Sequence, residues 1–78
     1  MLVLTKIEAL ERLIVSDFRL ANNIGINTST EMIVTILADC GARFIAARDL
    51  GDKELLRSAE HNLRLMSNVY STRVPFIV

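Results

Sequence analysis

The chain has 78 residues, one cysteine and a formal net charge of +0, with 9 basic and 9 acidic side chains. A single cysteine excludes an intramolecular disulfide, and the charge balance provides no bulk field to attract nucleic acid or an anionic membrane. Hydrophobic residues make up 51% of the chain, charged residues 23%, and the mean hydropathy is +0.37. Because a single core in so short a chain contributes little stability, we expect some of this apolar surface to be buried against another chain.

The sequence predicts a cytoplasmic protein that does not span a membrane. Its start, MLVLTKIEAL, lacks the basic region, the long apolar run and the small-residue cleavage site of a secretory signal. The longest apolar run contains Asp39 and Arg43, which would be costly inside a bilayer. A lone thiol also suits a reducing compartment.

A first helix is predicted over residues 6–23. It begins after Thr5, because Thr5 and Glu8 have the T-x-x-E spacing of a capping box. Asp17 is expected near the edge of its apolar stripe, and Gly25 is expected to adopt a left-handed conformation just past its end. The apolar stripe, spaced by three and four residues, consists of Ile7, Leu10, Ile14, Ala21 and Ile24, widened by Leu13 and Phe18.

The central helix, predicted over residues 29–50, is apolar on nearly every side. A second T-x-x-E pattern, from Thr28 to Glu31, is expected to cap its start. Its polar interruptions are four residues apart and form one narrow stripe of Thr35, Asp39 and Arg43. Small residues, Ala38, Ala42 and Ala46 with Gly41 beside them, would allow another helix to approach closely. Such a helix needs neighbours on more than one side.

A third helix is predicted over residues 53–71, after Gly51 as the C-terminal cap of the central helix and Asp52 as its own N-cap. Its apolar seam consists of Leu56, Ala59, Leu63, Met66 and Tyr70, and its other face carries Arg57, His61, Arg64 and Asn68. Glu60 is expected to pair with Arg64 one turn later. Val74 and Pro75 then force an extended backbone.

Together these elements predict an all-α fold: one domain over residues 1–78, built as a three-helix up-down-up unit with apolar extended termini. We expect it to assemble as a helical dimer, or on a partner protein, through the central helix and the tail. The predicted interface consists of Ala38, Asp39, Gly41, Ala42, Arg43, Ile45, Phe76 and Val78. Two points stay open. Asp39 and Arg43 are either a solvent-facing pair or a specificity device, and the tail covers either its own core or a partner.

No catalytic, cofactor or metal site is predicted. His61 lies among polar residues without a partner at a useful spacing, so we expect an exposed histidine. Cys40 lies on an apolar helix face without a nearby cation, so we expect a buried thiol. The ligand spacings of a zinc site are absent from the sequence.

The leading hypothesis is therefore a non-enzymatic protein-interaction module that acts as a regulator, adaptor or inhibitor. The alternative is a DNA-associated regulator or antitoxin-like dimer that uses Arg57, His61 and Arg64, although nucleic acid is disfavoured by the charge balance. A helix-turn-helix register is also disfavoured, because it would place Arg57 and Glu60 at apolar positions. A small enzyme would have only Asp39, Arg43 and His61 to use, and ranks last.

Overall fold

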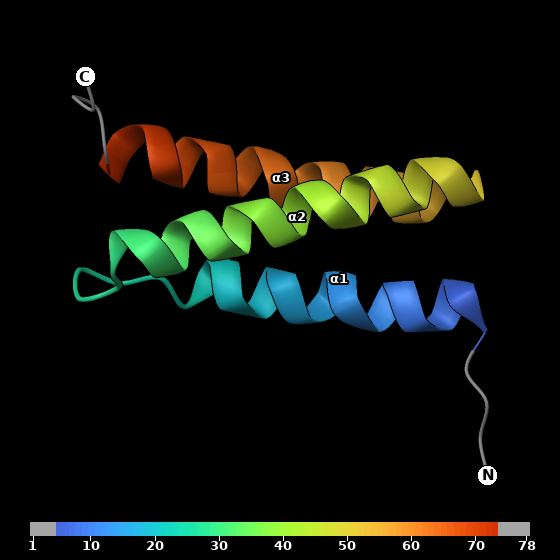
Figure 1. Cartoon of the computed structure of the whole chain (residues 1–78), viewed down its shortest axis with the longest axis horizontal. Helices are drawn as coiled ribbons and strands as arrows, with labels where there is room; N and C mark the ends of the chain where they lie inside the picture. The colour runs from blue at the N-terminus through green and yellow to red at the C-terminus, as the bar shows by residue number, and fades with distance from the viewer. Residues whose placement is uncertain (1–4, 74–78) are drawn as a thin grey trace, which may run out of the picture.

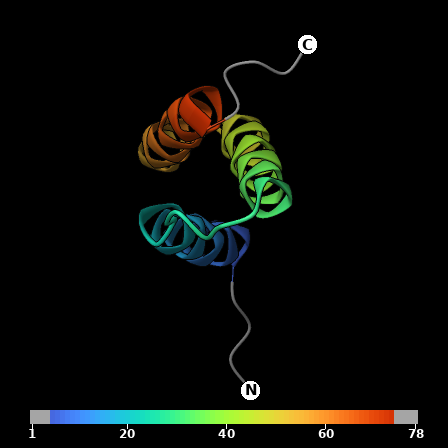
Figure 2. The same ribbon diagram turned by 90° about the vertical axis from the view of Figure 1, so that its left-hand side faces the viewer.

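The computed structural model describes residues 5–73, which form three α-helices: α1 (Lys6–Asn22), α2 (Thr30–Leu50) and α3 (Lys53–Arg73) (Figure 1). This range contains no strand, so the predicted all-α fold of three helices is confirmed. The third helix continues past its predicted end at residue 71 to Arg73. Viewed along the helices, α2 lies on one side of the bundle next to both α1 and α3, so the side formed by α1 and α3 faces away from it (Figure 2).

Side-chain caps fix the helix starts, and one predicted cap was wrong. In α1, the Glu8 amide donates to Thr5 Oγ1 at 3.1 Å and the Glu8 carboxylate accepts from the Thr5 amide, which confirms the first capping box. The N-cap of α2 is Ser29, whose Oγ accepts from the Met32 amide at 3.1 Å. Thr28 does not cap α2, because its hydroxyl accepts from the Gly25 amide inside the loop.

The connection between α2 and α3 follows the prediction. Gly51 ends α2 with φ 72°, the left-handed conformation in which a Cβ is unfavourable. The Leu55 amide donates to Asp52 Oδ1 at 3.0 Å, which caps α3. The predicted left-handed conformation of Gly25 was wrong. The C-cap of α1 is Asn23, with φ −102°, and Gly51 is the only residue between 5 and 73 with a positive φ.

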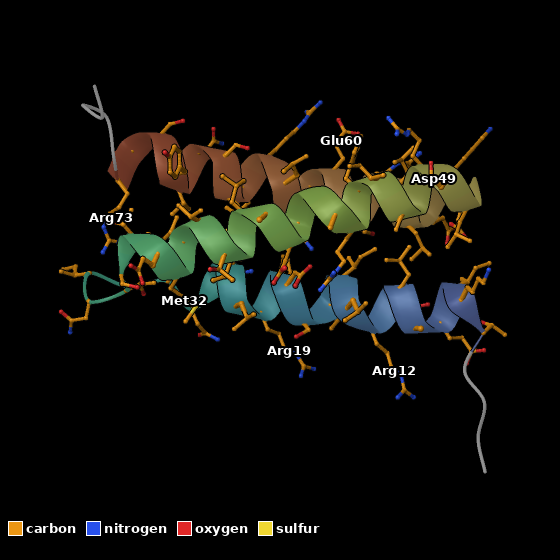
Figure 3. The ribbon with its side chains drawn as sticks, viewed as in Figure 1. Arg12, Arg19, Met32, Asp49, Glu60 and Arg73 are labelled. Atoms are coloured by element: carbon orange, nitrogen blue, oxygen red, sulfur yellow. The ribbon has the colours of Figure 1, made fainter. Side chains whose placement is uncertain are left out.

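The α1–α2 loop is held by Arg73, the last residue of α3. The Arg73 guanidinium donates to the carbonyl of Gly25 at 3.0 Å and to those of Ile26 and Thr28 at 2.6 Å each. The side chain points from the end of α3 toward this loop (Figure 3). A planar guanidinium presents several donors in a fixed fork, so one side chain can satisfy carbonyls that no helix uses.

The core runs along the three helices as two clusters of buried side chains. One consists of Leu10, Ile14, Ala47, Leu55 and Ala59, and the other of Ala21, Ile33, Ile36, Cys40 and Met66. Ala47 and Ala59 are fully buried, so small side chains set how closely the helices approach.

The core differs from the predicted stripes at the outer helices. Ile7, Leu13 and Phe18 were expected in the core, but each is 44% exposed. In α3, Leu55 and Asn62 are buried although the predicted seam omitted both. The buried side of α3 is therefore rotated from the predicted seam, and apolar side chains of α1 are left at the surface. Of α1, α2 and α3, none is both long enough and apolar enough to cross a membrane.

Candidate functional site

A buried ion pair joins α1 to α2. Asp17 is 3% exposed, and its Oδ2 lies 3.3 Å from Arg43 Nε. Both atoms are buried, and neither has a hydrogen-bond partner within residues 5–73. Two expectations were wrong here. Asp17 lies in the core instead of at the stripe's edge, and Arg43 pairs with Asp17 of α1 instead of Asp39 one turn back.

Burial dominates the electrostatics around this pair. It raises the pKa of Asp17 above its ordinary value, against the opposing influence of Arg43 and with a smaller contribution from Asp39. Burial also raises the pKa of Cys40 to about 11, and the carboxylates of Asp17 and Asp39 add to this effect. Cys40 is 1% exposed, as predicted for a buried thiol. A protonated, enclosed thiol is a poor nucleophile.

Asn62 is a second buried polar residue that sequence reasoning missed. Its Nδ2 donates to the carbonyl of Ile14 at 2.9 Å, which ties α3 to α1 through the core. Asn62 is 3% exposed and lies in the same helical row as Leu55, Ala59 and Met66. These four positions have helical spacing, so the sequence contained a signal for the row. The polar Asn62 interrupts the apolar pattern, and the row was therefore missed.

The middle of the α2 surface that faces away from α1 and α3 is apolar and built around small side chains, whereas the exposed Glu31, Thr35 and Asp49 lie nearer the ends of the helix. We call this middle part the α2 outer face, and it consists of Val34, Ala38, Gly41, Ala42 and Ile45. Val34 is 44% exposed and Ile45 is 50% exposed. A Cβ added to Gly41 would meet nothing within 4 Å in the described part of the chain.

The structure therefore places together four of the predicted interface residues, Ala38, Gly41, Ala42 and Ile45. Asp39 is half-buried beside them, and Arg43 turns inward to Asp17. Phe76 and Val78, the other two predicted interface residues, lie outside the described residues. A specificity role for Asp39 and Arg43 stays a prediction, and Arg43 contributes to the contact between α1 and α2.

A groove runs between α1 and α3 on the side away from α2. We call it the α1–α3 groove. Its larger section has a volume of about 420 Å³, and a second section of about 370 Å³ shares Ile14, Val15 and Ser58 with it. The rings of Phe18 and His61 lie across the groove from each other, tilted by 40° with centroids 6.1 Å apart. The other lining residues are Arg57 and Asn62 in the larger section, and Ile7, Glu11, Asp52, Glu54 and Leu55 in the second.

The predicted nucleic-acid face is not uniformly basic. Arg57, His61 and Arg64 surround a shallow depression together with Glu60, and Glu60 forms an ion pair with Arg64 as predicted. On α1, Arg12 and Arg19 point away from the bundle on another side (Figure 3). The described arginines therefore do not gather into one stripe in a single chain, and nucleic-acid binding stays a prediction.

Within residues 5–73, no group of three or more His, Cys, Asp or Glu side chains is placed to hold a metal ion. The similarity of the chain to known proteins was tested at three levels. Family models, characterised proteins and solved structures give no significant match.

Proposed function

We propose that this chain is a cytoplasmic, non-enzymatic interaction module. In this proposal the up-down-up helical unit forms a homodimer through the α2 outer face and binds a partner protein as a regulator, adaptor or inhibitor. The observation that carries the proposal is the uncovered apolar row on the central helix, where Val34 and Ile45 are 44% and 50% exposed around a centre of alanine and glycine.

Small side chains favour a close helix pair. Ala38, Gly41 and Ala42 would allow two copies of α2 to approach at the short end of the usual interaxial range, about 8 Å. Val34 and Ile45 lie on either side of this centre, so each can pack against the partner helix around a two-fold axis. The same patch on both chains then forms an isologous interface.

The helix is long enough for such an interface. α2 has 21 residues, which at 1.5 Å per residue is about 30 Å. A stable interface buries about 800 Å² per partner.

Sedimentation equilibrium of Ala42→Glu tests the proposal. We expect the natural chain to be dimeric at micromolar concentration and Ala42→Glu to be monomeric, because dimerisation would bury an uncompensated carboxylate. Ser16→Glu is the matched control, since it places the same charge at an exposed helical position on α1, and it should stay dimeric. Circular dichroism should show equal helix content in all three. A natural chain that stays monomeric throughout would refute the proposal.

A further inference from the structure

The α1–α3 groove would stay open in a dimer formed through the α2 outer face. The groove is lined by residues of α1 and α3 and by Asp52, and α2 lies on the other side of this helix pair (Figure 2). The two surfaces can therefore be occupied at once.

The α1 wall of the groove is apolar and incompletely covered. Ile14 is buried and forms part of the floor, whereas Val15 and Phe18 are each 44% exposed above it. Ile7, also 44% exposed, extends this apolar wall into the second section. These side chains recur at helical spacing, so they form a stripe that another helix can cover.

Acidic side chains line one section of the groove, and an arginine lines the other. Glu11 and Glu54 line the second section, together with Asp52, which caps α3. Arg57 is the charged residue of the larger section, where the imidazole of His61 can donate a hydrogen bond. Glu54 and His61 are two helical turns apart on α3, a separation of about 10 Å along the axis.

From this pattern we infer that the α1–α3 groove binds an amphipathic α-helix of a partner protein. The apolar stripe of that helix lies on Val15 and Phe18. It carries a basic residue over Glu11 and Glu54 and an acidic residue about two turns away, over Arg57 and His61. A helix in this position completes a four-helix bundle and uses the helix-in-groove mode of recognition. The inference rests on the partner-binding half of the proposed function and is independent of dimerisation.

Three labelled synthetic helical peptides test the charge pattern by fluorescence anisotropy. They share one apolar stripe and differ only at two flanking positions seven residues apart, which carry Lys and Glu, two Glu, or two Lys. We expect the Lys and Glu peptide to bind at least about tenfold more tightly than either like-charged peptide, because each of those loses one ion pair and gains a repulsion.

Groove variants test the site itself. Phe18→Ala should weaken binding of the Lys and Glu peptide by about tenfold or more, as expected for a central aromatic contact. Leu20→Ala is the matched control, because Leu20 is 45% exposed on α1 but does not line the groove. The double variant Arg57→Glu with His61→Glu should reverse the preference in favour of the peptide with two Lys.

Several results would overturn the inference. One is the absence of saturable binding, and another is equal binding of all three peptides with no effect of Phe18→Ala. A change of oligomeric state in Phe18→Ala would assign the groove to a second copy of the chain. Peptide binding only after removal of residues 74–78 would assign it to the chain's own tail. Ala42→Glu should bind the peptide as the natural chain does, so a failure of dimerisation is distinguishable from a failure of this inference.

Discussion

Replacing Arg43 by methionine tests whether the buried pair of α1 and α2 depends on charge compensation. Methionine keeps an unbranched apolar stem but leaves the carboxylate of Asp17, which is 3% exposed, without a cation. Removing one member of a buried pair costs about 3–5 kcal/mol. Because the Arg43 side chain is 24% exposed and part of its charge reaches water, we expect a smaller loss of about 2–3 kcal/mol in the free energy of unfolding.

The loss should depend on pH in a defined direction. Burial raises the pKa of Asp17 in the folded chain above its ordinary value of 3.8, so its contribution to stability is greatest below that value and declines as the pH rises through the folded pKa. Removing Arg43 takes away the influence that lowers this pKa. The difference between the natural chain and Arg43→Met should therefore be largest near neutral pH and shrink as the pH falls into the carboxyl range.

Urea unfolding followed by circular dichroism over a series of pH values measures both effects. A loss of this size corresponds to a melting temperature lower by roughly 10–20 °C in so small a domain. Adding Asp17→Asn to Arg43→Met should restore much of the lost free energy of unfolding, because the asparagine amide leaves no uncompensated charge in the core. A loss under about 0.5 kcal/mol, or one of the same size at every pH, would show that compensation of Asp17 by Arg43 does not stabilise the fold.

Three other predictions concern the loop, the thiol and the glycines. Arg73→Ala should lower the free energy of unfolding by about 1 kcal/mol and speed amide exchange in residues 25–28, with Arg73→Lys restoring it in part; unchanged exchange would contradict the role of the guanidinium. Cys40 should react with an alkylating reagent at a rate that follows unfolding, because it is enclosed and its pKa is raised to about 11; fast labelling of the folded chain would contradict its burial. Gly51→Ala should lower the free energy of unfolding by about 1 kcal/mol because of its left-handed backbone. Gly41→Ala should raise the free energy of unfolding of the single chain by up to about 1 kcal/mol and weaken self-association in sedimentation.

The helices were predictable because each has a local signal. Thr5 with Glu8, Gly51 and Asp52 use hydrogen bonds or backbone geometry within a few residues, and these are visible in the sequence. The second capping box failed at Thr28, because its hydroxyl had a competing partner in the loop. Sequence spacing shows which hydrogen bonds are possible, but not which of two will form.

Contacts between helices were not predictable to the same degree. Arg43 was expected to pair with Asp39 because the two are one turn apart, but the position of α1 offers it Asp17 instead. The rotation of α3 that buries Asn62 also depends on a carbonyl 48 residues away, that of Ile14. The exposed Val15 and Phe18, and hence the α1–α3 groove, follow from these rotations and carry no separate signal in the sequence.

The hydrogen bonds from Arg73 to the α1–α2 loop have a consequence for the sequence of events in folding. Its three acceptors lie 45 to 48 residues earlier in the chain, so during synthesis the loop is made long before the side chain that secures it. The hydrogen bonds that hold this loop can therefore form only after the last residue of α3 has been added. A chain truncated before Arg73 keeps all three helical segments but loses the hydrogen bonds that connect the α1–α2 loop to the end of α3.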